Sequence, residues 1–176
     1  MNHSETMNAN VLRITSAVVM LMKVSVWAQQ PCTPWLYNIE FQKCYRKYCD
    51  ERNPEDSQKV CQQHGGNLVT ICSEAEGEFV GTLGHVATGY PNQNLQKTWI
   101  GYRRNPNNKE QWQWRSGSTC KYTNWWEFEP NNQAGNEDNA HLYTDYDGAT
   151  NKWNDHSPDA YNYICERSTC PQEDVA

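Results

Sequence analysis

Oxygen-bearing side chains gather in one stretch of the chain, between residues 129 and 155. Three carboxylates and two amides in this stretch are candidate metal ligands: Glu129, Asn131, Glu137, Asn154 and Asp155. Hard cations such as calcium bind about six to eight oxygen atoms, drawn from carboxylates and amide carbonyls. The stretch could therefore hold a divalent cation and leave coordination positions open for the hydroxyl groups of a ligand.

Each part of this stretch has a simpler interpretation when it is taken alone. Glu129-Pro130-Asn131 is typical of a turn, because Pro presets φ and Asn tolerates unusual backbone conformations. Trp153-Asn154-Asp155 is typical of a buried Trp followed by a polar turn. The combination of these parts favours a metal site over the separate structural interpretations.

The composition predicts a single domain that is rich in loops. The chain has 176 residues, of which 37% are apolar, with eight Cys, eight Trp and ten Tyr. Disulfides and large aromatic side chains can stabilise such a domain where the apolar content is low. The net charge of −6 argues against a nucleic-acid partner, which favours a basic surface.

Residues 1–28 have the pattern of a secretory signal peptide. Arg13 supplies the positive charge, residues 14–22 form a short apolar run, and cleavage is expected after Ala28. The run is shorter than the ~20 apolar residues of a membrane-spanning helix. We therefore expect a secreted protein without a membrane span, with a mature domain over residues 29–176. Its Cys residues should form disulfides rather than a zinc site, and no C-x-x-C spacing occurs.

The elements that must position the candidate ligands can be placed from local patterns. One helix should begin at Asn53-Pro54 and stop at Gly65-Gly66. A second should open at the capping box Ser73–Glu76 and bury an apolar face. That face is expected to contain Ala75, Phe79, Leu83 and Val86.

Short strands are expected around these helices and along the second half of the chain. The first two should be joined by a local Cys32–Cys44 bridge. The later ones should lie at residues 68–71, 99–102, 111–114, 140–143, 153–155 and 161–166. Residues 120–133 match no strand or helix pattern, and a loop of this length in a compact domain is usually functional or disordered. Trp125 and Trp126 argue against disorder.

From about Cys32 to Glu166, the chain resembles the C-type lectin domain family. The resemblance rests on a series of motifs in the expected order and spacing. They include Cys44-Tyr45, Gly66-Asn67-Leu68-Val69, Trp99-Ile100-Gly101, Glu129-Pro130-Asn131, Glu137-Asp138, Trp153-Asn154-Asp155 and Ile164-Cys165-Glu166.

This resemblance implies a mixed α+β domain, with two helices, two small antiparallel sheets and a long calcium-binding loop. It implies a Cys61–Cys165 bridge, and Cys32–Cys44 as the extra bridge of the longer form. It also implies that one calcium is held by the five candidates above, and that the peptide bond before Pro130 is cis, since cis bonds are essentially confined to proline.

The resemblance further implies a secreted, calcium-dependent lectin that takes equatorial vicinal hydroxyls of mannose, fucose or N-acetylglucosamine. Galactose-type members carry Gln-Pro-Asp, whereas this chain has Glu129-Pro130-Asn131. Cell-surface or microbial glycans and a role in innate recognition would follow, with self-association to raise the avidity of weak single sites. The alternative is a domain of the same fold that binds a protein or ice. Enzymatic activity is not expected, because the chain lacks a nucleophile elbow, a zinc-binding helix and a phosphate loop.

The chain departs from the family pattern in its cysteines. Asn139 and the stretch 157–159 stand where most members have a disulfide, so we hypothesise that the long loop depends more on calcium for its order. Four further cysteines could form two intrachain bridges, or one of them could link a dimer: Cys49, Cys72, Cys120 and Cys170.

A second calcium often lies beside the first in this family. The positions that align with its ligands include Asn105, Lys109, Asn132 and Asp138. Lys109 has the wrong charge for a calcium ligand, so we expect one principal ion.

Overall fold

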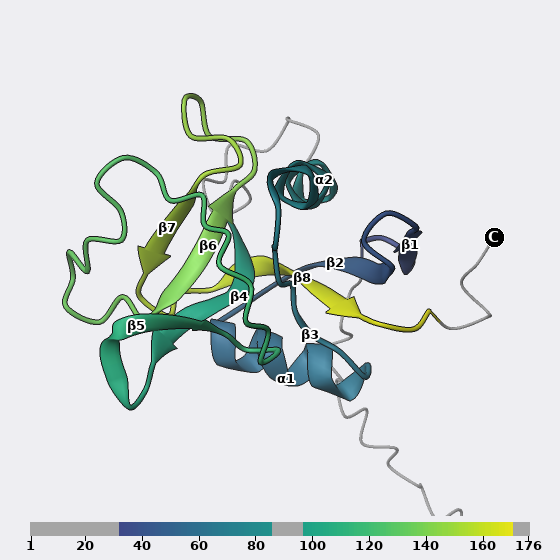
Figure 1. The fold of residues 1–176 in the computed structure, drawn as a ribbon, viewed down its shortest axis with the longest axis horizontal. Coiled ribbons are helices and arrows are strands. Elements are labelled where there is room, and N and C mark those ends of the chain that lie inside the picture. The colour runs from purple at the N-terminus through teal and green to yellow at the C-terminus, as the bar shows by residue number, and fades with distance from the viewer. Residues whose placement is uncertain (1–31, 86–96, 171–176) are drawn as a thin grey trace, which may run out of the picture.

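The computed structural model describes residues 32–85 and 97–170 (Figure 1). The expected signal peptide and Val86 lie outside these residues. Within the described ranges, no helix is long and apolar enough to span a membrane. The described chain contains helices α1 (Pro54–Gln63) and α2 (Glu74–Gly84) and strands β1 (Leu36–Asn38), β2 (Lys43–Arg52), β3 (Asn67–Leu68), β4 (Lys97–Asn105), β5 (Asn108–Trp114), β6 (Asn139–Tyr143), β7 (Trp153–His156) and β8 (Tyr161–Arg167).

The strands form two antiparallel groups that are joined at the centre of the molecule. The path of hydrogen-bonded strands runs β1-β2-β8-β4-β6-β7, with β3 also paired to β8 and β5 to β4. β4 and β8 pair in parallel through Thr98 and Trp99, and the other pairings are antiparallel. The α+β C-type lectin architecture is therefore confirmed, with its two expected sheets connected into one.

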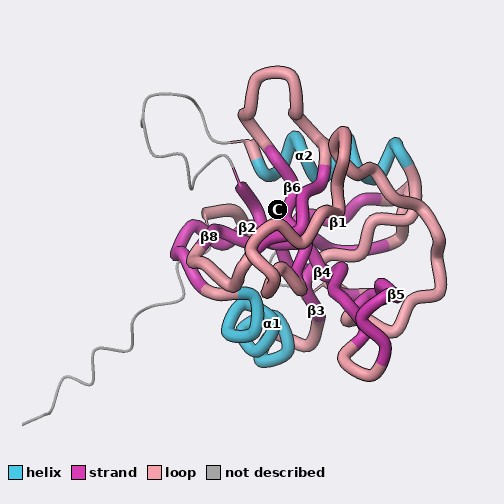
Figure 2. Tube along the Cα trace, turned by 90° about the vertical axis from the view of Figure 1, so that its left-hand side faces the viewer, coloured by secondary structure: helices cyan, strands magenta, loops and turns pink. Residues whose placement is uncertain are grey.

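The two helices lie on opposite sides of β2 and β8 (Figure 1, Figure 2). Both begin as their sequences predict. The Asn53 side chain accepts a hydrogen bond from the Asp56 N–H at 2.9 Å, and Ser73 accepts one from the Glu76 N–H at 3.2 Å. Each cap satisfies a backbone donor that has no partner within its own helix. Gly65, just past α1, has a positive φ of 76°, a conformation that glycine adopts without strain.

The predicted core face of α2 is confirmed only in part, since Phe79 and Leu83 pack against the core but Ala75 does not. Ala75 is exposed and Phe79 and Leu83 are half-buried, whereas Val80 and three glycines are buried. The reason is a close approach of neighbouring residues to the helix. A Cβ atom on Gly81 would lie 1.7 Å from the Asn151 side chain, and one on Gly84 would lie 2.5 Å from Thr144.

All eight cysteines of the chain are paired in the described structure. The bridges are Cys32–Cys49, Cys44–Cys170, Cys61–Cys165 and Cys72–Cys120. Cys61–Cys165 matches the predicted pairing and ties α1 to β8. The six other cysteines also form intrachain bridges, so none of Cys49, Cys72, Cys120 and Cys170 is left to link a dimer.

The predicted Cys32–Cys44 bridge is wrong. The Cys32 N–H donates to the Lys47 carbonyl at 2.9 Å, which places Cys32 near the far part of β2 and Cys49. Cys44 is fully buried and pairs in register with Arg167 of β8, three residues before Cys170. The path of the chain before β1 therefore decides the pairing.

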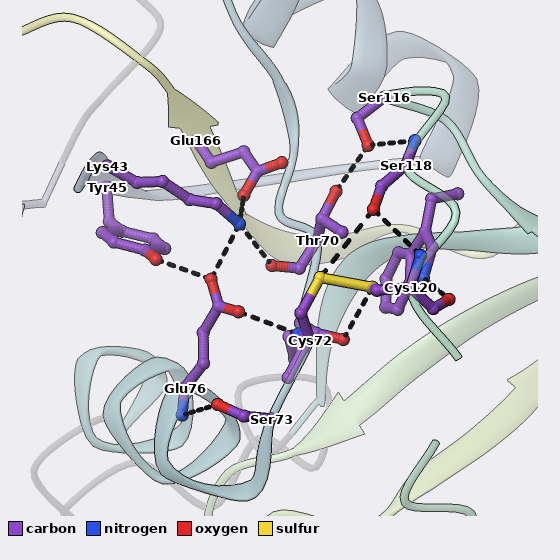
Figure 3. The surroundings of a disulfide bond; sticks show 12 residues. Lys43, Tyr45, Thr70, Cys72, Ser73, Glu76, Ser116, Ser118, Cys120 and Glu166 are labelled. Carbon is purple, nitrogen blue, oxygen red and sulfur yellow. Dashed lines mark hydrogen bonds and ion pairs between the residues drawn. A yellow bond between two sulfur atoms is a disulfide. The ribbon is translucent and has the colours of Figure 1, made fainter. Parts of the chain in front are cut away.

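A buried ion cluster fastens α2 to the strands (Figure 3). The Lys43 ammonium lies 2.9 Å from Glu76 and 3.0 Å from Glu166. Tyr45 and the Cys72 N–H also donate to Glu76, at 2.6 and 2.8 Å. Glu76 therefore serves the core rather than closing the predicted capping box with its side chain.

Candidate functional site

The candidate site lies where the long loop between β5 and β6 crosses β7. Aromatic packing holds this loop in place, because the Trp125 ring lies 4.8 Å from Trp112 and 5.9 Å from the fully buried Trp153. Two backbone hydrogen bonds of 2.8 Å also join it to β7, from Trp126 N–H to Trp153 and from Trp153 N–H to Asn124. The loop is ordered by these contacts, as its tryptophans indicate.

The turn at Glu129-Pro130-Asn131 folds over the end of the Asp155 side chain. The Glu129–Pro130 bond is cis, the isomer that the resemblance implies. The Asn131 N–H donates to Asp155 Oδ1 and the Asn132 N–H to Oδ2, both at 3.0 Å. Residues that are 24 positions apart in the chain are therefore brought into contact, with the Asp155 carboxylate fully buried between them.

Arg104 of β4 supplies the positive charge that faces this carboxylate. Its Nη2 donates to Asp155 Oδ2 at 2.9 Å, and its Nε donates to the Glu137 carbonyl at 3.1 Å. The guanidinium also lies 4.8 Å from the centre of the Trp112 ring. Arg104 therefore fixes both Asp155 and the segment that carries Glu137.

The pKa of the Glu129 carboxyl group is raised by burial and by the neighbouring acidic groups. Burial raises the pKa of Glu129, the adjacent Asp155 raises it further, and Glu137 adds a smaller effect, to give a pKa of about 7. The Asn131 N–H, 3.2 Å from Glu129 Oε2, acts in the opposite direction. Two acidic groups are thus held close together, an arrangement that a bound cation would stabilise.

Glu137 and Asn154 present oxygen atoms that lack a protein partner. Glu137 is 8% exposed, and its carboxylate has no hydrogen bond or ion pair within the described residues. Asn154 donates from Nδ2 to the Tyr143 hydroxyl at 3.2 Å, which leaves its Oδ1 without a donor in the described ranges. Neither set of oxygens is among the fully buried polar atoms without partners, so both remain accessible to water, an ion or a ligand.

These residues fit calcium by donor type, with two qualifications from their geometry. Among the described residues, no three His, Cys, Asp or Glu side chains are close enough to hold a metal by themselves. Asn131 Oδ1 accepts the Gln133 N–H at 2.7 Å and so has a partner already. An ion here would depend on amide oxygens as well as carboxylates, and it would share Asn131 Oδ1 with the Gln133 N–H.

Three neighbouring positions take roles that the sequence only partly indicates. The Lys109 ammonium pairs with Asp138, and both residues align with the ligands of a second calcium. The Asp138 carboxylate therefore already has a cation beside it. At the positions of the missing disulfide, Asn139 accepts a hydrogen bond from Arg115 at 2.7 Å. Nearby, Ser157 donates to Asn136 at 2.7 Å.

Comparison with known proteins identifies the domain. Residues 50–167, well over half of the chain, match the family model described as the Lectin C-type domain. The chain belongs to the C-type lectin domain family. Human C-type mannose receptor 2 is 34% identical over 113 residues, which cover 64% of this chain but only 7% of that receptor. The C-type lectin lectoxin-Lio1 of Erythrolamprus poecilogyrus is 32% identical, over 68% of this chain and 71% of its own length.

Solved structures of C-type lectin domains and related proteins superpose on this chain. The mouse scavenger receptor C-type lectin carbohydrate-recognition domain has a TM-score of 0.61 and 27% identity, covering 76% of this chain and 94% of that one. Herring type II antifreeze protein has a TM-score of 0.62 over 77% of this chain and 97% of its own. Its identity of 23% shows a common fold alone.

Sequence reasoning missed Arg104 at this C-type lectin site, and it named Asn132 only among the positions of a second calcium. Arg104 belongs to a strand whose pattern indicates only a buried element. Asn132 has a positive φ of 48° and accepts the Glu137 N–H at 3.0 Å, so it links the two halves of the loop. Asn131 is a candidate ligand because it belongs to the Glu129-Pro130-Asn131 motif. The adjacent Asn132 could have been included because it has the same residue type.

Proposed function

We propose that this C-type lectin domain binds one calcium ion and uses it to recognise sugars with equatorial vicinal hydroxyls, of the mannose, fucose or N-acetylglucosamine type. The proposed ligands are Glu129, Asn131, Glu137, Asn154 and Asp155. The observation that carries the proposal is the closure of the Glu129-Pro130-Asn131 turn on the buried Asp155 carboxylate, at 3.0 Å from the Asn131 N–H.

The chemistry of sugar recognition follows from the donors and acceptors in this set. Bound calcium would supply coordination positions for two hydroxyl oxygens. A carboxylate only accepts hydrogen bonds, whereas an amide also donates from its NH2 group. Glu129 with Asn131 can therefore accept a proton from one hydroxyl and donate to its oxygen, and Glu137 with Asn154 can do the same for the neighbouring hydroxyl.

A hydrogen bond to the Tyr143 hydroxyl fixes the orientation of the Asn154 amide. The hydroxyl lies 3.2 Å from Asn154 Nδ2, so it holds the Asn154 oxygen on the other side of the amide. Burial raises the pKa of Tyr143, the hydrogen bond from Asn154 lowers it, and the negative charge of Glu129 raises it by a smaller amount. Tyr143 thus serves as a positioning residue for the Asn154 amide.

We further propose that the protein is secreted and acts on cell-surface or microbial glycans. Four disulfides are consistent with an oxidising compartment. A single shallow site binds one sugar weakly, so self-association into a homo-oligomer would supply the avidity needed for function. Members of this family are generally binding modules without catalytic activity, and the proposal assigns none.

The alternative function is binding of a protein or of ice on the same fold. The likeness to an antifreeze protein concerns the fold alone. Family members of that kind typically lose some of the calcium ligands, whereas all five ligand positions are kept here. The sugar function is therefore the better supported of the two.

Retention on immobilised mannan tests the proposal directly. The wild-type protein should bind in calcium and elute with EDTA or free mannose, but not with galactose. Glu137→Gln should lose retention while keeping its melting temperature, since Glu137 has no protein partner to lose. Glu110→Gln, which neutralises an exposed carboxylate on β5, is the matched control and should bind as the wild type does. Absence of retention, or retention that survives EDTA, would favour the alternative.

A further inference from the structure

A pocket of about 400 Å³ opens between the β4–β5 hairpin, the start of α1 and the segment before β6. Five charged side chains line it: Glu55, Arg103, Arg104, Lys109 and Asp138. Arg104, which lines this pocket, also pairs with Asp155, and none of the five proposed calcium ligands lines it.

The two carboxylates that line this pocket, and Asp155 beyond Arg104, already have cationic partners. Arg115 donates to both oxygens of Glu55, at 2.5 and 3.1 Å, and it lowers the pKa of Glu55. Lys109 pairs with Asp138, and Arg104 pairs with Asp155 at 2.9 Å. These three acids are therefore neutralised without any contribution from outside the protein.

The remaining cation is Arg103, which has no such partner. Its guanidinium makes no hydrogen bond or ion pair within the described ranges, and its Nε is buried without an acceptor. Its influence on Glu55 is a longer-range lowering of the pKa, weaker than that of Arg115. A guanidinium offers five N–H donors in a planar fork, and an unmade hydrogen bond of a buried donor is costly.

A second donor faces the same pocket. Asn139 also lines it, and its Oδ1 is fixed by the hydrogen bond from Arg115 Nη2 at 2.7 Å. Its NH2 group is therefore oriented away from Arg115, and it has no acceptor within the described part of the chain. The pocket thus combines a surplus positive charge with a free amide donor, in a protein whose net charge is −6.

We propose that this pocket binds an oxyanion, with Arg103 as its main ligand and Asn139 as a second donor. The class of group that fits is a carboxylate, a sulfate or a phosphate, because a planar guanidinium pairs with two oxygens of such groups at once. The group can belong to a free ion or to an acidic sugar. Oxyanion binding at Arg103 needs no calcium, whereas the acidic-sugar source rests on the proposed calcium-dependent sugar binding.

Titration with inorganic sulfate in EDTA tests the site without calcium. Amide chemical shifts of the protein are followed at constant ionic strength, with chloride as the replaced anion. Sulfate should shift residues around Arg103 in a saturable way, and Arg103→Gln should weaken the binding at least about tenfold, the loss expected for one charge-assisted pair. Lys121→Gln removes an exposed positive charge elsewhere and should leave the binding unchanged. Equal shifts in wild type and Arg103→Gln, or shifts that do not saturate, would overturn the proposal.

A second measurement distinguishes the two sources of the oxyanion. A sulfated N-acetylglucosamine is compared with its unsulfated form and with inorganic sulfate, each in calcium and in EDTA. Tighter binding of the sulfated sugar in calcium alone assigns the pocket to an acidic glycan. Equal binding of sulfated sugar and inorganic sulfate in both buffers assigns it to a free ion. Either result requires Arg103, so a sulfate effect that persists in Arg103→Gln contradicts the site in both cases.

Discussion

Arg104 Nη2 lies 2.9 Å from Asp155 Oδ2, and this pair joins β4 to β7 beneath the candidate calcium site. The Asp155 carboxylate is fully buried, while the Arg104 side chain is 14% exposed. A buried carboxylate without a cation is strongly unfavourable. In the calcium-free protein, Arg104 is therefore the cation that pairs with the buried Asp155 carboxylate.

Loss of Arg104 should destabilise the protein more in EDTA than in calcium. Arg104→Gln leaves Asp155 with backbone donors alone, and breaking a buried pair in this way costs about 3–5 kcal/mol. Bound calcium would replace the lost positive charge, so the loss in calcium should be smaller. By linkage, the variant should bind calcium more tightly than the wild type. Urea unfolding in the two buffers measures this, with Lys121→Gln as a control for loss of one exposed charge. An equal loss in both buffers would contradict a cation beside Asp155.

Calcium affinity should fall as the pH drops below about 7. The pKa of Glu129 is raised from 4.5 to about 7 in the calcium-free protein, so Glu129 takes up a proton on folding between those values. This proton favours the calcium-free state, whose stability falls as the pH rises through that window. Calcium must displace the proton, because a protonated carboxyl group is a poor ligand.

Calorimetry at about pH 7.5 and about pH 5.5 measures this linkage through the calcium affinity and the protons released on binding. Glu129→Gln should bind calcium weakly at both pH values and release fewer protons. An affinity that is the same at the two pH values would argue against carboxylate ligation.

The long loop should gain order from calcium, because it lacks one disulfide of the usual pattern. In place of that bridge, Ser157 donates to Asn136 at 2.7 Å, a weaker restraint than a covalent bond. Cys72–Cys120 fastens the start of the loop. Amide hydrogen exchange over residues 129–138 should therefore slow in calcium, while exchange near Cys120 changes little. Equal protection of both regions with and without chelator would exclude this dependence.

The buried ion cluster should contribute more stability than an exposed pair. Lys43→Met leaves Glu76 and Glu166, which are 2% and 7% exposed, without their shared cation. We expect a loss of about 3–5 kcal/mol in the free energy of unfolding. Lys59→Met breaks the exposed pair with Asp56 and should have little effect. Similar losses in the free energy of unfolding for the two variants would show that burial does not increase the contribution of the cluster to stability.

The sequence predicted the elements of the fold better than the contacts between them. Both helix starts follow from local capping signals at Asn53 and Ser73, which act within one turn. The buried face of α2 does not follow from local signals. It depends on how close Asn151 and Thr144 come to Gly81 and Gly84. Periodicity of apolar residues cannot show that a helix packs through glycines.

The same limit applies to the disulfides and to the site. Cys61–Cys165 follows from the family pattern, whereas Cys32–Cys49 depends on the contacts that Cys32 and Thr33 make with β2. The residue types of the calcium ligands were readable as motifs. Arg104 was not, because its role arises from the side-by-side placement of β4, β6 and β7.

Crystals soaked with calcium and methyl α-mannoside provide the most direct test of the proposed function. We predict one ion within about 2.3–2.6 Å of oxygens from Glu129, Asn131, Glu137, Asn154 and Asp155, with two sugar hydroxyls completing its coordination. An ion held elsewhere, or a sugar bound without contact to an ion at this site, would contradict the account.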